Sequence, residues 1–191
     1  MLNFDDQRAL DAVAEVDLSE RPDAYVQRAA HLGEVNGIDD IAVLSGLIDP
    51  DSAPTELTSW AMGSLGRSGE EGWRKIGELV HAKNEDVAVA AASMLLRNGD
   101  DSGLELLIRF GKTAAFDKVV NVVDTLSEYA QPEHVPALIE LLERPDGWDE
   151  RRHLPEKIVD TLHELTGENF GEVAEAWKLW WKLNNGGVTA Q

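Results

Sequence analysis

The sequence has no cysteine among its 191 residues, which excludes thiol catalysis, thiolate-bound zinc and disulfide frameworks. No apolar run approaches the roughly 20 residues of a membrane-spanning helix, and the first residues lack the basic start of a secretory signal. We therefore expect a cytoplasmic protein with no membrane partner. A chain of this length buries about 70% of its unfolded surface and needs no disulfide or metal ion to fold.

Basic residues are scarce as well. Seventeen Lys and Arg stand against 36 Asp and Glu, so the formal net charge is −19. Nucleic-acid affinity depends largely on Lys and Arg that neutralise phosphates, and no basic patch stands out, so we expect no nucleic-acid partner. The same sign favours a basic protein partner, which long-range attraction brings to the surface quickly.

Motifs for catalysis or metal binding are also missing. The five histidines are scattered, and no two have the i, i+4 spacing that places two imidazoles on one metal ion. The glycines of residues 63–69 are followed by no Lys-Ser or Lys-Thr pair, so they predict no phosphate loop. His163 has the spacing for a surface ion pair with Glu156 or Asp160. We expect no enzymatic activity, no cofactor and no metal ion.

The sequence does contain an internal repeat of 31 residues, with Ile41, Gly72, Gly103 and His134 in register. Apolar positions then align in columns, and their offsets of three and four residues predict two short helices in each unit. No segment alternates apolar and polar residues long enough to predict a strand. The clearest columns are Ile76, Leu107 and Leu138; Ile48, Leu79, Phe110 and Leu141; Ala61, Ala92 and Val123; and Ser64, Leu95 and Leu126.

Turn residues mark the ends of the predicted second helices, where Gly or Pro follows a basic or aromatic residue. Acidic residues then open the next first helix, because carboxylates accept backbone N–H groups and lie at the positive end of the helix dipole. Part of the negative charge therefore has a structural role. The ends lie at 67–69, 97–99 and 129–132, and the acidic starts at Asp39-Asp40, Glu70-Glu71, Asp100-Asp101 and Glu133.

The predicted fold is a single all-α domain, an α-solenoid of stacked antiparallel helix pairs with about ten to eleven helices. An insertion of about five residues around 143–150 interrupts the fourth unit. The predicted parts are N-terminal cap helices within 1–36 (4–17 and 22–33), repeats over 37–167, a capping helix over 168–184 with an apolar face of Val173, Trp177, Trp180 and Trp181, and a loose tail over 185–191.

The repeat resembles that of the HEAT-like helical repeat proteins, especially the short bacterial forms. Pro132–Leu142 (PEHVPALIELL) is similar to the first helix of such a repeat, and Val87–Leu96 (VAVAAASMLL) to the second. Leu162–Gly171 (LHELTGENFG), followed by Trp177 and Trp180-Trp181, is similar to the final helices of many bacterial HEAT-repeat chains. The resemblance implies a curved stack whose concave wall is lined by the second helices and binds other macromolecules.

An acidic stripe runs along the predicted second helices. A shift of 36 residues, the repeat plus the insertion, aligns Asp124 with Asp160 and Glu128 with Glu164. Each helix thus has like charges at i and i+4, which destabilise it by roughly 0.2–0.5 kcal/mol per pair. Two interpretations are open: a wall that meets a basic partner, or the solvated face of an acidic protein. The candidate binding residues here are Asp117, Asn121, Asp124, Glu128, Glu156, Asp160 and Glu164.

Trp148 lies in the insertion among acidic residues. An exposed Trp there would anchor a partner, because aromatic side chains concentrate binding energy at the centre of interfaces. The alternative is that Trp148 folds back over the last helix pair. Asp146, Trp148 and Asp149 are therefore further candidate partner-binding residues.

The sequence predicts a non-enzymatic protein-binding module, monomeric when free, that covers a basic partner through complementary charge. The narrower hypothesis is an immunity or inhibitor protein that neutralises a basic toxin such as a nuclease. One alternative is a general HEAT-repeat scaffold or regulatory protein with a housekeeping partner. Another is a HEAT-like enzyme or lyase-type chaperone for a pigment, which would need a clustered polar pocket.

Overall fold

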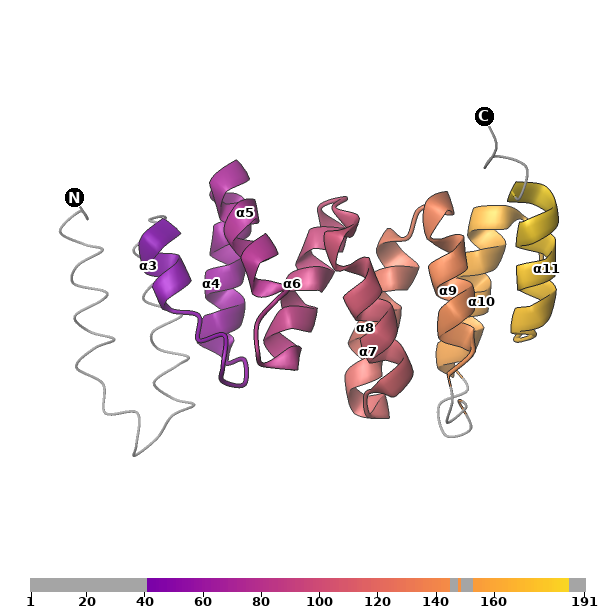
Figure 1. The fold of residues 1–191 in the computed structure, drawn as a ribbon, viewed down its shortest axis with the longest axis horizontal. Helices are drawn as coiled ribbons and strands as arrows, with labels where there is room; N and C mark the ends of the chain where they lie inside the picture. The colour runs from indigo at the N-terminus through magenta and orange to yellow at the C-terminus, as the bar shows by residue number, and fades with distance from the viewer. Residues whose placement is uncertain (1–40, 145–147, 149–152, 186–191) are drawn as a thin grey trace. The chain divides into compact units, whose positions relative to one another are not determined.

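The computed structural model describes residues 41–144, 148 and 153–185 (Figure 1), and these residues form an all-helical chain. No strand occurs within these ranges, so the predicted all-α class is confirmed for them. The predicted cap helices 4–17 and 22–33, the acidic start Asp39-Asp40 and residues 186–191 of the tail lie outside the described residues. The helices are α3 (Ile41–Gly46), α4 (Glu56–Arg67), α5 (Glu70–Leu79), α6 (Glu85–Arg97), α7 (Leu104–Thr113), α8 (Phe116–Tyr129), α9 (Val135–Leu142), α10 (His153–Thr166) and α11 (Ala174–Asn185), with 3-10 turns η1 (Asp101–Gly103) and η2 (Pro132–His134).

The helix ends follow the predicted turn residues. Helices α4, α6 and α8 end at Arg67, Arg97 and Tyr129, each the first residue of a predicted stop. Gly69 and Gly99 follow with φ of 76° and 78°, a left-handed conformation that glycine adopts without steric cost. The local sequence thus fixes where the second helices end.

The acidic starts are also present. Glu70 and Glu71 occupy the first turn of α5. The side chain of Asp100 caps η1 by accepting a hydrogen bond from the Ser102 amide at 2.9 Å. These carboxylates satisfy or face the free N–H groups of helix N-termini, as the sequence predicted.

The chain divides into two compact units, residues 1–94 and 95–191. In the described part of the first unit, α4 packs against both α3 and α5, with Leu44, Leu65 and Ile76 fully buried. A Cβ atom at Gly72 would lie 1.9 Å from the Leu65 carbonyl oxygen, so the close approach of α5 to α4 requires glycine there.

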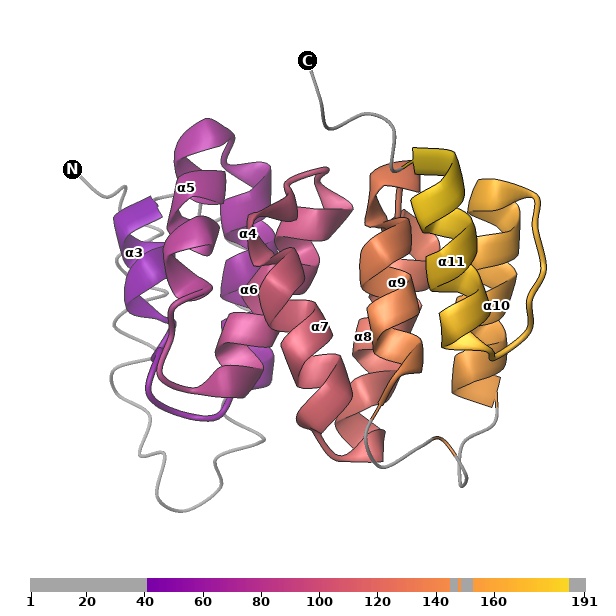
Figure 2. The ribbon, with the colours of Figure 1, turned by 45° about the vertical axis from the view of Figure 1, so that its right-hand side comes forward.

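The second unit has two layers of helices, visible in Figures 1 and 2. Helix α9 contacts both α7 and α11, and these three form the first-helix layer; α8 contacts α10, and these two form the second-helix layer. The pairs α7–α8 and α9–α10 join the layers. Between them lie the predicted apolar columns, since Leu107, Phe110, Val123, Leu126, Leu138 and Leu141 are all buried.

The predicted apolar face of the last helix is only partly buried. Trp177 is fully buried, and Trp180 and Trp181 are half-buried. Val173 precedes the first residue of α11 and is 59% exposed. The face therefore centres on Trp177, whose ring packs edge-on against Phe170 with centroids 4.9 Å apart.

Candidate partner-binding surface

The two layers of the second unit differ in charge. Helices α7, α9 and α11 carry four basic and three acidic side chains, a net charge of +1. Helices α8 and α10 carry two basic and six acidic side chains, a net charge of −4. Glu128 and Glu164 lie in the last turns of their helices, where the dipole disfavours negative charge. Helix capping therefore does not explain these two acids, whereas Glu156 lies in the first turn of α10, where the dipole favours negative charge.

Most of the predicted stripe residues are exposed to solvent. Asn121, Glu128, Glu156, Asp160 and Glu164 are exposed and Asp124 is half-buried, while the side chain of Asp117 on α8 lies outside the description. The side chains of Glu156, Asp160 and Glu164 form no hydrogen bond or ion pair in the described part of the chain. We refer to Asp124, Glu128, Glu156, Asp160 and Glu164 as the acidic wall.

One cation lies within the acidic wall. Lys157 Nζ donates to Asp124 Oδ1 at 2.7 Å, and both side chains are about half exposed (45% and 47%). This contact shows that α8 and α10 present the stripe on the same side of the layer. Sequence reasoning missed Lys157, although the 36-residue shift places it one helical turn before the position that matches Asp124.

The acidic wall does not continue onto α6, the second helix that precedes α8 in the chain. The 31-residue register places Ser93 and Arg97 of α6 at the positions of Asp124 and Glu128. Arg97 donates to Thr125 Oγ1 at 3.4 Å, and its guanidinium lies 5.7 Å from the ring centroid of Tyr129. The aligned acids thus occur on the two successive second helices α8 and α10. In the preceding second helix, α6, an arginine occupies the position equivalent to Glu128.

Tyr129 is linked to the acidic wall through Glu128. A hydrogen bond with the Glu128 carboxylate raises the pKa of the Tyr129 hydroxyl above its usual value, mainly by favouring the protonated phenol. The wall therefore combines unpaired carboxylates with an aromatic residue at one edge, the kinds of group that recognise basic side chains.

The insertion contributes a buried tryptophan. Trp148 is only 7% exposed, and the Arg144 guanidinium lies 5.5 Å from its ring centroid. Trp148 as an exposed anchor is therefore wrong, because its ring is buried in the chain. Asp146 and Asp149 lie outside the described residues.

Arg144 itself is 6% exposed and binds the C-terminal end of α7. Its Nη1 donates to the Gly111 carbonyl at 2.6 Å, and its Nη2 donates to the Ala114 carbonyl. A cation there satisfies carbonyls that the helix leaves free and complements the negative end of the dipole. This role was not predictable from the sequence, because the acceptors are backbone atoms.

Two of the described histidines, His134 and His163, have structural partners. Buried His134 accepts a hydrogen bond from the Gln131 amide at Nδ1, and its Nε2 lies 3.0 Å from Asp101 Oδ2. His163 Nδ1 lies 2.9 Å from the Glu168 carbonyl oxygen and does not pair with Glu156 or Asp160. In the described ranges, no group of three or more His, Asp or Glu side chains is placed to hold a metal ion.

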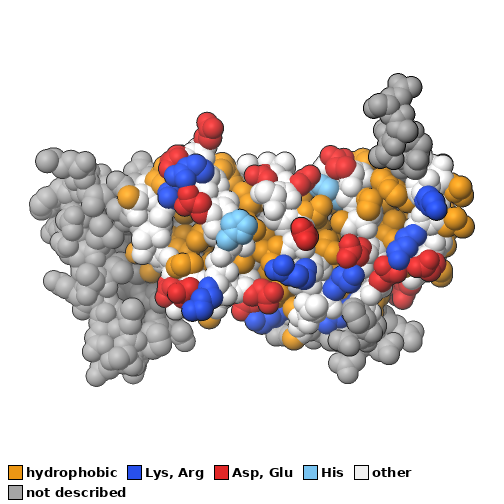
Figure 3. All heavy atoms as spheres, in the orientation of Figure 1, with side chains coloured by type: hydrophobic (Ala, Val, Ile, Leu, Met, Phe, Trp, Pro, Cys, Tyr) orange, Lys and Arg blue, Asp and Glu red, His pale blue; other side chains and the backbone are white. Residues whose placement is uncertain are grey.

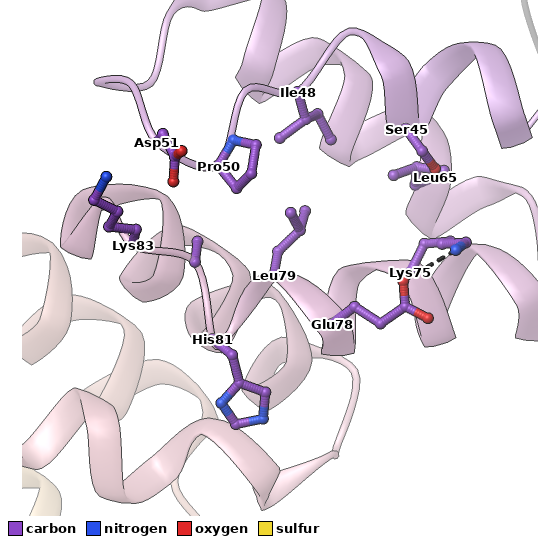
Figure 4. A pocket seen from close by; sticks show the side chains of 11 residues that line it. Ser45, Ile48, Pro50, Asp51, Leu65, Lys75, Glu78, Leu79, His81 and Lys83 are labelled. Atoms are coloured by element: carbon purple, nitrogen blue, oxygen red, sulfur yellow. Dashed lines mark hydrogen bonds and ion pairs between the residues drawn. The ribbon is translucent and has the colours of Figure 1, made fainter.

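A pocket of about 500 Å³ lies in the first unit (Figure 4). Ile48, Leu65 and Leu79 supply apolar walls, and Lys75 pairs with Glu78 at 3.0 Å. Figure 4 shows Lys83 and Lys75 at opposite ends of the pocket. The two lysines thus do not converge on a common point of the pocket.

A second pocket, of about 390 Å³, lies in the first-helix layer beside Ile139 and Trp181. Its cations are paired with acids: Lys112 lies 3.0 Å from Glu140, and Lys178 pairs with Glu143. The hydrogen bonds of Lys178 to Glu143 and, to a lesser degree, to Glu175 raise the pKa of its ammonium group. In Figure 3, basic and acidic side chains likewise lie next to one another on the face shown.

Compared with known proteins, the chain matches no family model, no curated protein sequence and no solved structure. Among the described helices, none combines the length and apolar character needed to cross a membrane.

Proposed function

We propose that the chain is a HEAT-like α-solenoid that acts as a non-enzymatic protein-binding module, with the acidic wall as its binding surface. The observation that carries the proposal is the net charge of −4 on α8 and α10, beside a first-helix layer of +1. Acids spaced four residues apart and in last turns destabilise their helices. Binding a basic partner gives these unfavourable positions a use.

The packing of the second unit supports the solenoid. First helices contact first helices, second helices contact second helices, and each pair is joined by a short turn or by the insertion. Stacked helix hairpins produce this pattern, because each repeat covers the apolar face of its neighbour. The 31-residue register of the buried columns supports the same arrangement.

The partner that fits this surface is a basic protein, and the narrower proposal is a basic toxin such as a nuclease. A nuclease carries positive charge where it binds phosphates, so a surface with exposed carboxylates would cover that site and inhibit it. Complementary charge would also speed the encounter. A general scaffold or regulatory protein with a housekeeping partner is the alternative.

The genetic context separates these alternatives. The protein encoded beside this chain's gene should be a basic toxin, and the purified chain should inhibit it in a one-to-one complex. Absence of a neighbouring toxin gene would contradict the immunity role. In that case, a basic protein that binds the chain at low salt and is released at high salt would be purified. Its association with the chain would then be measured.

The acidic wall is tested by charge reversal. In one variant, Asp124, Glu128, Asp160 and Glu164 are changed to Lys; in the matched control, the exposed residues Glu105, Glu133, Glu168 and Glu172 are changed to Lys. Both variants have a formal net charge of −11, from −19 plus 8. We expect the wall variant to associate roughly 10- to 100-fold more slowly at low salt and to lose most of its salt dependence.

Stopped-flow association rates over a series of salt concentrations measure this effect, and circular dichroism checks that both variants fold. The control should stay much closer to the wild-type rate, because only the overall charge has changed. Equal loss in both variants would show that net charge rather than the acidic wall drives association. An unchanged rate in the wall variant would remove the wall from the function.

A further inference from the structure

Helix α11 has an inner face that is fully used in packing. Trp177 is buried, and its Nε1 donates to the Gly171 carbonyl at 2.8 Å. Trp181 lines the pocket beside Ile139, and Lys178 pairs with Glu143 across to the end of α9. These residues are spaced three and four apart, so they define one side of the helix.

The outer face of α11 is apolar and exposed. Leu179 and Leu183, one turn apart, are 60% and 75% exposed, and half-buried Ala176 and Trp180 lie on the same face. Val173, Leu179 and Leu183 are the large hydrophobic residues exposed among those described, and all three lie at this end of the second unit. Figure 3 shows hydrophobic side chains at the surface over α11, at the right-hand edge.

The position of α11 in its layer explains why this face is free. Helix α9 covers α7, and α11 covers α9, whereas no later helix of the described chain covers α11. The outer face of α11 is therefore apolar, like the helix faces in this layer that pack against a neighbouring helix. A contiguous apolar surface of this kind marks an interaction site.

Charge along the edge of the face indicates which helix it receives. Glu175 and Lys182 are exposed and lie on the same edge, two turns apart. An antiparallel copy of α11, related by a two-fold axis between positions 178 and 179, brings each Glu175 level with Lys182 of the other copy. In a parallel two-fold pair, Glu175 and Lys182 of one copy would lie on the opposite edge from those of the other, so no such pairs would form.

We propose that two copies of the chain associate through the outer faces of α11, packed antiparallel around Leu179. The second copy's α11 takes the place of a next helix in the first-helix layer, and Leu183 of each copy packs near Ala176 of the other. Helix α11 carries two basic and one acidic side chain, so it opposes self-association less than the rest of this acidic chain. This inference is independent of the acidic wall and differs from the sequence-based prediction of a monomer, so the oligomeric state decides between them.

The dimer is expected to be weak and concentration-dependent, since the face is a few turns of one helix. Analytical ultracentrifugation of the full chain should show a shift from the 21.0 kDa monomer toward twice that mass as concentration rises. Replacing Leu179 and Leu183 together by Ser should abolish the shift without unfolding, because both side chains are exposed. A wild-type chain that stays monomeric throughout, or a double variant that dimerises as before, would overturn the proposal.

The antiparallel direction is tested by exchanging charges. Glu175→Lys alone should weaken the dimer roughly tenfold, since two attractions across the interface become two repulsions. Adding Lys182→Glu should restore it. Glu175 also pairs with Lys178 of its own helix at 3.1 Å, but the double exchange does not rebuild that pair, so rescue reports the contact between copies. Failure of the rescue would contradict this pairing.

Single cysteines give a direct readout, because the chain has none of its own. Leu179→Cys places two thiols beside the two-fold axis, where they should form a disulfide between copies. In the matched variant Leu183→Cys the two thiols lie roughly 13 Å apart along the helix axis, from a rise of 1.5 Å per residue, beyond disulfide reach. Crosslinking of Leu179→Cys alone supports the proposal; crosslinking of both variants or of neither would overturn it.

Discussion

In the first-helix layer of the second unit, charged side chains contribute to the packing of the helices. Lys112 joins α7 to Glu140 of α9 at 3.0 Å, and Lys178 of α11 pairs with Glu143 at the end of α9. In the second-helix layer, Lys157 and Asp124 are paired, but Glu156, Asp160 and Glu164 have no such partner in the described chain. Acidic residues of one protein thus differ in whether the fold pairs them, and the acidic wall is the place where three such unpaired carboxylates share one helix.

Helix α5 of the first unit follows the pattern of the first-helix layer. Arg74 pairs with Glu71 and Glu78, and Lys75 lies 3.0 Å from Glu78. These contacts lower the pKa of both carboxyl groups, through Arg74 for Glu71 and mainly through Lys75 for Glu78. Their stabilisation is therefore present above the ordinary carboxyl pKa and is lost as the pH falls through the lowered values.

The largest expected loss of stability follows removal of the buried Arg144 guanidinium, which binds backbone carbonyls. Arg144→Ala leaves the Gly111 and Ala114 carbonyls without their donor and removes the cation beside Trp148. We expect the free energy of unfolding to fall by roughly 2–4 kcal/mol. Urea denaturation measures the change. Arg109→Ala, at an exposed position of α7, should stay within about 0.5 kcal/mol of wild type; equal effects would show that Arg144 is not structural.

The next largest loss of stability is expected where α7 and α9 pack closely in the first-helix layer. A Cβ atom on Gly111 of α7 would lie 2.6 Å from Leu141 Cδ1 of α9, so Gly111→Ala forces the two helices or the leucine to move. We expect a loss of roughly 1–3 kcal/mol in the free energy of unfolding. Gly77→Ala in α5 meets no atom within 4 Å and should stabilise the chain by roughly 0.5–1 kcal/mol. Thermal unfolding of both variants compares them, and a stabilising Gly111→Ala would contradict the tight contact.

Periodicity explains why so much of the helical layout was predictable. The columns of Leu107 and Leu138 are buried because a fixed repeat brings equivalent positions to equivalent environments. The same register placed Asp160 and Glu164 at exposed positions of α10. Roles that depend on irregular backbone had no such signal: Arg144 binds the end of α7 from a segment outside the repeat.

The burial of Trp148 was open from the sequence for a related reason. Acidic neighbours in the sequence suggested exposure, whereas in the folded chain the ring is buried beside the Arg144 guanidinium. The pairing of Lys157 with Asp124 depended on the lateral offset of α8 and α10, which a register in whole residues does not specify. The positions of the acidic wall were thus predictable from the repeat, whereas the pairing of Lys157 with Asp124 was not.

The smallest expected change in stability tests most directly whether the two layers differ in their use of charge. Asp160 lies four residues from both Glu156 and Glu164 on α10 and three from Lys157, so Asp160→Lys turns two like-charge pairs into opposite-charge pairs and one opposite-charge pair into a like-charge pair, a net gain of one favourable pair. We expect the free energy of unfolding to rise by roughly 0.5–1 kcal/mol at low salt, with the gain shrinking in high salt as charges are screened. Urea denaturation at both salt concentrations measures this.

Asp124→Lys is the matched control, because it places a second lysine beside Lys157 and should not stabilise the chain. If Asp160→Lys raises stability and slows association with the basic partner, the same carboxylate is unfavourable for the fold and favourable for binding, as expected of a functional surface. A variant that stabilises the chain and leaves association unchanged would place Asp160 outside the binding surface. A variant that destabilises it would show that the fold uses this charge after all.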